Sequence, residues 1–464
     1  MRRTLAIALL TLRAAFRYRV VLVMALLLLA AVVILPLIIK DDGTARGFSQ
    51  IILTYTLTLM TALLGFSTLW LSCGILAREI EDAQMQLVVV KPIARWQIWL
   101  GKWLGILTLN ALLLAVTGAA VYGLTVWRAQ KLPPKELAIL QKEIFVARQS
   151  AKEELPDFDA MANDVLRERL KKNPMPEGLS VPALRNIIKE QLKSRNSVVP
   201  PGYRNQWDIP VGNPSKVKDL PLTIRTKVDP PVPGIETWFQ THWEFGDPNT
   251  NTVFQTNMLV PGEAAIEFNI PANLASWINQ EGRPEFVLQI RMDNYSEKPM
   301  VFPLEDGLEV LYRVGGFGGN FFRGLMVIFC WLALLAALGL SAATFLSFPV
   351  AAFCTIGVLM VCFSTGTLKQ IVTEGGIVEV NPNSGFADSP SLINQVSVPM
   401  AKVLLFTFDL ARGFSPIDSL SSGRAITWSE LGKAVVQICI LLSGLLAVIG
   451  MFIFTRRELA TAQK

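Results

Sequence analysis

Charged residues and histidine are scarce in this chain. Of its 464 residues, 17% are charged and 52% are hydrophobic, whereas about a quarter of the residues in soluble domains are charged. The single histidine, His242, leaves little room for a histidine-based metal site or a Ser/His catalytic triad. The five cysteines all fall in apolar stretches, so the sequence indicates no disulfide framework and no thiolate metal site.

Nucleotide-binding and hydrolase signatures are also missing. The sequence has no G-x-x-x-x-G-K-[ST] phosphate loop and no G-x-S-x-G nucleophile motif. Residues 157–168 resemble a calcium loop, but Met161 and Ala162 stand where an oxygen ligand and a glycine are required. We expect no catalytic residue, no metal and no cofactor on this chain. The modest net charge of +6 does not point to nucleic acid.

Long apolar stretches are abundant instead. A helix needs about 20 apolar residues to cross a bilayer, and six stretches qualify: Val20–Ile39, Ile51–Leu76, Ile98–Trp127, Gly324–Phe345, Pro349–Leu368 and Gly432–Phe454. In residues 1–19, Leu5, Leu9, Leu12 and Phe16 share one helical face, and arginines interrupt the apolar run. This pattern predicts an amphipathic interfacial helix rather than a signal peptide. The sequence therefore predicts a membrane protein with a six-span α-helical bundle.

Basic residues at the ends of the spans predict the orientation. They precede span one, lie between spans two and three, and follow span six: Arg2, Arg3, Arg13, Arg17, Arg19, Arg78, Lys91, Arg95, Lys102, Arg456 and Arg457. Six spans place all three groups on one side, which the positive-inside rule assigns to the cytoplasm. We therefore expect both termini and loop 77–97 in the cytoplasm of a multi-pass cell (inner) membrane protein. Residues 128–320 are expected outside, in the periplasm or the extracellular space.

The expected organisation has two membrane parts around a large insertion. Spans one to three occupy 20–127 and spans four to six occupy 321–464, with an outer re-entrant segment at about 398–415. The insertion, 128–320, is expected to be an extracytoplasmic α+β domain with a helical part, 132–195, and a β-sandwich at about 207–315.

Two patterns support this division of the insertion. Leu137, Leu140, Ile144 and Ala147 are spaced as one helical stripe, and further helices are expected near Asp157 and after Pro182. From about residue 220, five segments have apolar residues at every second position, which is typical of a sandwich. "NSVVPPGYRNQW" is predicted to be a linker and "GGFGGN" a flexible hinge before span four. The aromatic residues of the insertion are either core residues or a surface that stacks on sugars or lipids, and their burial decides between the two: Tyr203, Trp207, Trp238 and Trp277.

Loop 77–97 combines charges of both signs in a short interval between two apolar spans. They are Arg78, Glu79, Glu81, Asp82, Lys91 and Arg95. The segment "AREIEDAQMQLVVV" is predicted to continue span two as a short helix that Pro92 ends. "ARWQIWLGK" then begins the next helix. A plain solvated loop is the simpler interpretation, but its length and mixed charge favour a docking surface for a cytoplasmic partner.

This loop resembles the first cytoplasmic loop of the membrane subunits of ABC exporters of the second type. Glu79 matches the family's first glutamate, 87–90 its aliphatic run, 92–95 its Pro–Arg element and Lys102 its lysine. The chain departs from the pattern at 83–84, where Ala-Gln replaces the usual Gly-Thr. The amphipathic start, the turn "ALGLSAATFLSFPVAA" and the basic ending "FIFTRRELA" extend the resemblance, whereas 128–320 is not part of it.

The resemblance implies a permease subunit of an ATP-driven ABC transporter, an exporter that moves an unknown substrate outward. A separate cytoplasmic ABC ATPase would hold ATP and Mg, and a second permease copy or a paralogue would complete a dimer in the lipid bilayer. The implied ATPase contacts are Glu79, Glu81, Gln84, Lys91, Pro92 and Arg95.

Two other classes remain open. One is an ABC-type mechanotransmission protein or a membrane-anchored binding protein that acts through its outer β-sandwich. The other is an intramembrane enzyme, for which Asn110 and Gln437 are the main polar candidates within the spans, and they are too few to make a convincing site.

Overall fold

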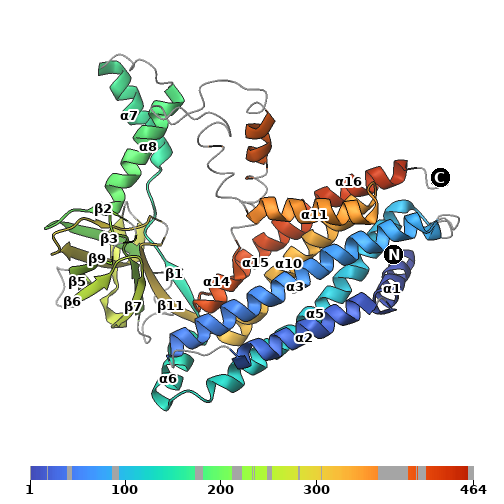
Figure 1. The fold of residues 1–464 in the computed structure, drawn as a ribbon. Coiled ribbons are helices and arrows are strands. Elements are labelled where there is room, and N and C mark those ends of the chain that lie inside the picture. Colours follow the sequence, from blue (N-terminus) through green and yellow to red (C-terminus); the bar gives the residue numbers. More distant parts are fainter. Residues whose placement is uncertain are drawn as a thin grey trace. The chain divides into compact units, whose positions relative to one another are not determined.

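The computed structural model describes residues 2–17, 19–38, 44–85, 93–172, 181–211, 222–232, 234, 236–247, 253–280, 283–304, 306–363, 372, 396–403, 405 and 414–457. The chain divides into two compact units, one comprising Met1–Ala147 with Gly316–Lys464 and the other Arg148–Gly315. The first unit is a bundle of long helices, and the second is rich in β-strands (Figure 1).

The first unit is built from apolar helices that lie side by side (Figure 1). Its helices are α1 (Arg2–Arg17), α2 (Arg19–Ile38), α3 (Ala45–Glu81), α5 (Arg95–Ala129), α6 (Pro134–Ile139), η1 (Leu140–Ile144), α10 (Phe317–Ala343), α11 (Phe348–Phe363), α14 (Pro416–Ser421), α15 (Trp428–Ala434), η3 (Val435–Leu442) and α16 (Ser443–Arg456). Within the described residues, four helices are long and apolar enough to cross a membrane: Gln50–Glu81, Arg95–Ala129, Phe317–Ala343 and Trp428–Arg456. Two shorter apolar helices, Val23–Leu35 and Phe348–Val361, fall where the sequence predicts spans one and five.

Helix α1 packs along the start of α5 through glycine. A Cβ atom added at Gly101 would lie 2.7 Å from Cβ of Ile7, and one at Gly105 would lie 2.7 Å from Cβ of Thr11. Small residues of this kind let helix backbones approach closely in membrane bundles. The leucine and phenylalanine face of α1 remains exposed, with Leu5 at 63%. The helix therefore packs on α5 through one face and leaves its apolar face free.

The second unit contains two sheets that enclose one core. One sheet has the order β1-β11-β4-β7, the other has the order β3-β9-β5-β6 with β8 paired to β9, and β2 pairs with β10. The strands are β1 (Val146–Ala151), β2 (Val198–Val199), β3 (Arg204–Pro210), β4 (Leu222–Lys227), β5 (Trp238–Phe245), β6 (Phe254–Pro261), β7 (Ala265–Ile270), β8 (Ser276–Gln280), β9 (Arg283–Asn294), β10 (Met300–Val301) and β11 (Leu308–Gly316). A short helix, η2 (Ala272–Leu274), precedes β8. The rings of Trp243 and Phe245 on β5 lie 6.2 and 5.7 Å from that of Phe268 on β7, so the two sheets pack face to face as a sandwich.

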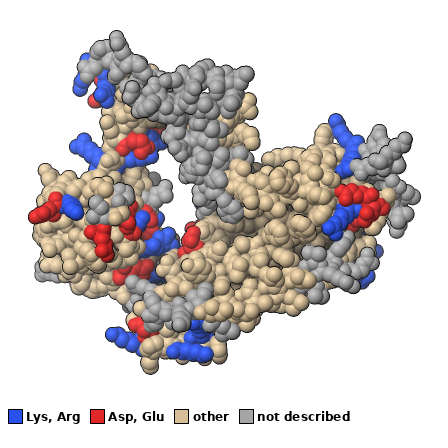
Figure 2. Space-filling view, viewed as in Figure 1, with Lys and Arg blue, Asp and Glu red and all other residues tan. Residues whose placement is uncertain are grey.

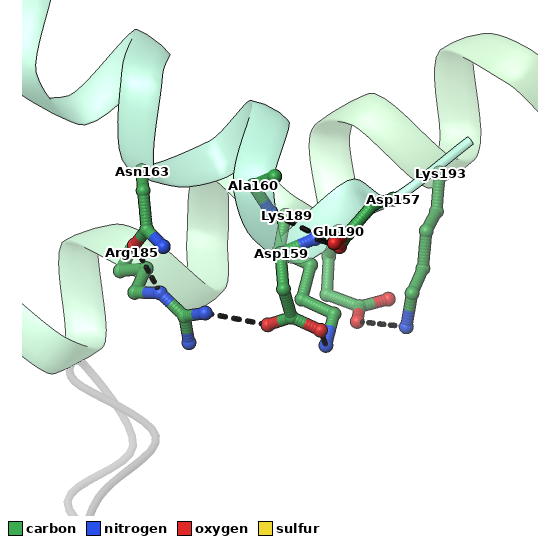
Figure 3. Close-up of polar contacts among 8 residues, drawn as sticks. All are labelled: Asp157, Asp159, Ala160, Asn163, Arg185, Lys189, Glu190 and Lys193. Atoms are coloured by element: carbon green, nitrogen blue, oxygen red, sulfur yellow. Dashed lines mark hydrogen bonds and ion pairs between the residues drawn. The ribbon is translucent and has the colours of Figure 1, made fainter.

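A helical hairpin lies between strands β1 and β2 in the chain. It consists of α7 (Phe158–Lys172) and α8 (Val181–Ser197), which bury a small apolar cluster between them. Asp157 caps α7 by accepting hydrogen bonds from the backbone N–H groups of Asp159 and Ala160. Asp159 in turn accepts hydrogen bonds from Lys189 and Arg185 of α8, each at 2.6 Å (Figure 3). The hydrogen bond from Lys189, together with Arg185, lowers the pKa of Asp159.

Three expectations for the insertion need correction. Segment 132–195 is not helical throughout, because 146–151 forms strand β1 beside β11, and Ala147 leaves the predicted helical stripe. "NSVVPPGYRNQW" is not a linker, since it contains β2 and the start of β3. "GGFGGN" is not a loop, because β11 ends at Gly316 and α10 begins at Phe317. In the first two cases, pairing within a sheet outweighs local propensity.

Half of the predicted outer re-entrant segment falls outside the described residues. Residues 396–403 are helical, and 406–413 are not described. The predicted segment at 398–415 therefore stays a prediction.

Candidate functional site

The charged interval lies at one end of the helical bundle, where α3 ends and α5 begins. Helix α3 stops at Glu81, and the backbone N–H of its cap, Asp82, donates to the carbonyl of Arg78. Ala83 follows with φ of 58°, in the left-handed region that favours glycine. Residues 86–92, which include the implied contacts Lys91 and Pro92, lie outside the described part of the chain.

Glu79 and Lys102 form an ion pair between α3 and α5. The Lys102 Nζ atom lies 2.6 Å from Oε1 of Glu79, and the side chains are 4% and 25% exposed. A buried ammonium is costly unless it is paired. The pair therefore stabilises the contact between the end of α3 and the first turns of α5, and it leaves Glu79 only partly available to a partner protein.

Arg95 binds the C-terminal end of α16. Its Nη1 atom lies 2.9 Å from the carbonyl oxygens of Phe454 and Thr455 and 2.8 Å from that of Arg457. The last carbonyls of a helix have no partner within the helix, and a cation placed there is favoured by the helix dipole. Arg95 thus joins the start of α5 to the end of the last helix.

Further contacts connect the turn between α10 and α11 to the same end of the bundle. Glu81 Oε1 accepts a 2.9 Å hydrogen bond from the backbone N–H of Phe348, the first residue of α11. Arg457 Nη1 donates to the carbonyl of Thr344, which caps α10, at 2.7 Å. The guanidinium of Arg78 lies over the ring of Phe348, 4.3 Å from its centroid. Charged groups of the interval therefore bind the ends of α11 and α16, and Arg457 binds the end of α10.

Acidic and basic side chains gather at the end of the bundle that carries α1 and the end of α16 (Figure 2). Of the residues implied as ATPase contacts, Glu79, Glu81 and Arg95 are brought together there by contacts within the chain. Glu81, Asp82 and Gln84 are exposed. Acidic and polar side chains therefore face solvent at the end of α3, and Trp96, which is 48% exposed, adds an aromatic group at the start of α5.

Sequence reasoning did not assign intramolecular partners to these residues. A lysine within an apolar span indicates that a partner is needed, because an unpaired charge inside the membrane has a high free-energy cost. That signal was present at Lys102. No sequence signal identifies the carbonyl groups that Arg95 binds, because they lie more than 350 residues away in the chain.

The aromatic residues of the sandwich form the second candidate site. Trp207 is 8% exposed, and its ring lies 6.3 Å from Trp243 and 5.1 Å from Phe302, so it belongs to the core. Trp238 and Tyr203 are 59% and 65% exposed. The side chain of Trp277 is outside the described set. Among the described aromatic residues of this set, Trp238 and Tyr203 are therefore the two that are exposed enough to stack on a sugar or a lipid.

Comparisons of the chain with family models, with curated proteins and with solved structures found no match in any of the three. The structure itself defines a coarse class, a membrane-associated protein with a helical bundle and an inserted region rich in β-sheet.

Proposed function

We propose that this chain is the permease subunit of an ATP-driven ABC transporter of the exporter type, which moves substrate outward with a separate ATPase subunit. The observation that carries the proposal is the set of contacts made by the residues that match the exporter loop. Glu79, Arg95 and Lys102 all bind other helices of the bundle. A movement of the loop would therefore displace the ends of the helices that these residues bind.

The division of roles within the loop follows from exposure. Glu81, Asp82 and Gln84 face solvent and supply the docking surface for a cytoplasmic ATPase. Glu79 and Arg95 act behind that surface, through Lys102 and through the carbonyls at the end of α16. Breaking a buried ion pair costs about 3–5 kcal/mol, and losing hydrogen bonds of a charged group costs about 1.5–3 kcal/mol. These contacts are therefore strong enough to hold the helix ends to the loop as it moves.

The topology is part of the same proposal. Helices α2 and α11 act as spans one and five beside the four longer helices, which gives six spans. Both termini and loop 77–97 lie in the cytoplasm, and the sheet-rich unit lies outside the membrane. A second copy or a paralogue completes the dimer.

Co-expression tests this proposal. The chain is produced with each ABC ATPase of the source genome that lacks membrane spans of its own, and co-purification and ATP hydrolysis are measured. One ATPase is expected to co-purify, and Gln84→Lys together with Asp82→Lys should release it while the bundle stays folded. Asp164→Lys in the exposed hairpin serves as the matched control. If no ATPase binds, or if the loop variants bind as well as the control, the exporter assignment is wrong.

A second candidate is force transmission to the sandwich without transport. Strand β11 passes into α10 with no residue between them, so a shift of α10 would reach the sandwich through a short connection. Reconstituted vesicles separate the two functions. ATP-dependent movement of cargo across the vesicle membrane supports export, whereas ATP-dependent change in the sandwich without cargo movement supports transmission.

A further inference from the structure

A groove of about 290 Å³ lies between α2, α3 and α5. Its size is at the lower end of the range for ligand pockets. Among the described residues that line it, only Ser67, Arg78 and Asn110 have markedly polar side chains, and the others are apolar, aromatic or glycine, such as Leu28 of α2, Leu71 of α3 and Leu113 of α5. The groove therefore fits a hydrocarbon chain better than a polar solute.

The groove follows one face of α3. Leu64, Ser67, Leu71, Gly74 and Arg78 line it at helical spacings of three and four residues. At 1.5 Å per residue, the distance from Leu64 to Arg78 is about 21 Å. This length exceeds one half of a bilayer core about 30 Å thick. An extended acyl chain is the kind of molecule that fills an apolar groove of these proportions.

Arg78 marks the end of the groove with a positive charge. Its guanidinium is held by stacking on Phe348, and the ring of Trp70 meets Phe348 edge-on at 5.1 Å. No residue in the described ranges forms an ion pair with Arg78, although Glu79 and Glu81 are close in sequence and have other partners. Stacking leaves the guanidinium N–H groups free to bind an anion, and the planar guanidinium suits phosphate.

A second observation points to a ligand. The Asn110 side chain lines the groove and is 2% exposed, and its Oδ1 accepts a hydrogen bond from Thr68. Its Nδ2 atom is buried and has no hydrogen-bond partner among the described residues. A buried donor without a hydrogen-bond partner destabilises the folded protein. The Asn110 amide can therefore donate to an acceptor atom of a molecule bound in the groove.

We infer that this groove binds an anionic phospholipid, with an acyl chain along α3 and the phosphate on Arg78. The inference goes beyond the proposed function and needs no ATPase, only a bilayer around the bundle. A helix from a second copy fits less well, because the acidic residues of the described span helices, Glu79, Glu81 and Glu430, lie at helix ends and already have partners within the chain. Basic pockets between membrane helices are known to favour anionic headgroups.

The test is photo-crosslinking of the purified full chain in nanodiscs. The probes are phosphatidylglycerol and phosphatidylcholine, each with a diazirine at the end of one acyl chain, and labelled peptides are mapped by mass spectrometry. We expect phosphatidylglycerol to label peptides of α3 and α5 around 64–75 and 109–113 in preference to phosphatidylcholine. Arg78→Gln should reduce the labelling by phosphatidylglycerol about ten-fold, because a charge-assisted hydrogen bond is lost.

Matched variants separate binding from general damage. Arg456→Gln is the charge control, because Arg456 also lies over a ring, that of Phe452, at 4.2 Å. Ser67→Phe should block the groove and abolish the labelling, whereas Ala115→Phe, which changes an exposed alanine of α5 outside the groove, should not.

Three results would overturn the inference. They are equal labelling by the two lipids in the unchanged protein, equal labelling in Arg78→Gln and Arg456→Gln, and disulfide crosslinking between two copies through a cysteine placed at Ser67. The last result would assign the groove to a second chain. ATPase binding is not measured, so failure here leaves the exporter proposal to its own test.

Discussion

The Lys102 ammonium lies 2.6 Å from the Glu79 carboxylate, and its side chain is almost completely buried. The two residues come from the end of α3 and the start of α5, on either side of the charged loop. Both are among the residues on which the exporter proposal rests. Their pairing gives a physical reason for the two residues to occur together, because each supplies the charge that the other needs in a poorly hydrated place.

The first prediction concerns this pair. Glu79→Gln leaves the buried Lys102 ammonium without its partner and should lower the free energy of unfolding by about 3–5 kcal/mol. Lys102→Met should cost less, because the Glu79 carboxylate is 25% exposed and can be hydrated. The double variant should recover most of the loss, since no unpaired charge remains. Thermal unfolding of the purified protein measures all three variants.

The exposed pair Asp164–Arg167 provides the control for these variants. Its side chains are 75% and 77% exposed, and surface pairs of this kind contribute about 0–1 kcal/mol. Asp164→Asn should therefore leave the unfolding temperature unchanged. If Glu79→Gln behaved like Asp164→Asn, the contact between Glu79 and Lys102 would have no structural role.

The second prediction concerns Arg95. Arg95→Gln removes the cation that binds the last carbonyls of α16, and loss of charged hydrogen bonds costs about 1.5–3 kcal/mol. Amide hydrogen exchange should accelerate in 452–457, with no change in the sandwich strands. Arg95→Glu should be worse, because its carboxylate would face carbonyl oxygens. Unchanged exchange at the end of α16 in both variants would mean that Arg95 acts only on a partner.

The third prediction concerns the left-handed residue after α3. Ala83 has φ of 58°, and this conformation costs a residue with a Cβ about 1–2 kcal/mol. Ala83→Gly should therefore stabilise the protein by about 1 kcal/mol after the entropy of glycine is included. Denaturant titration measures the gain.

Glu263 is a useful comparison for Ala83. It also has a positive φ, 66°, but its Oε1 accepts a hydrogen bond from the backbone N–H of Gly234. Glu263→Gly should give no net gain, because relief of strain is offset by loss of that bond. A gain at Glu263 with none at Ala83 would contradict the assignment of strain to the loop.

Local patterns in the sequence predicted much of the fold. The segments with period-two spacing contain strands β4, β5, β7, β9 and β11, because one face of each strand must face the core. Asp157 was expected near a helix start and caps α7. Strand β1 was missed, since its residues follow a helical segment and join the sheet beside β11, which is distant in the sequence. Such long-range pairing leaves no local pattern.

The candidate site was predictable only in part. The clustering of charges between two spans identified the interval, whereas the partner that a lysine within α5 requires was not predicted. The roles of the residues depend on where α11 and α16 end. Those positions determine that Glu81 meets Phe348 and that Arg95 meets Phe454. The sequence alone assigned all of these residues the same role, whereas the structure divides the described ones into a partly buried group, Glu79 and Arg95, and an exposed group, Glu81 and Gln84.

The last prediction concerns acid stability of the sandwich. Asp293 on β9 accepts two hydrogen bonds from Arg204 on β3, at 2.7 and 2.8 Å, and these lower the pKa of Asp293. A carboxyl whose pKa is lowered on folding adds stability above its unfolded pKa of about 3.9 and loses it as pH falls through the folded value. Asp293→Asn should thus destabilise β3 and β9 by about 1 kcal/mol at pH 7, and the deficit should disappear as the pH falls through the lowered pKa of Asp293. Hydrogen-exchange protection factors, corrected for intrinsic rates, report this difference strand by strand.

Asp164→Asn is the control for this prediction and should show no such dependence on pH. A stability deficit in Asp293→Asn that persists unchanged in acid would show that packing, rather than charge, accounts for the contribution of Asp293.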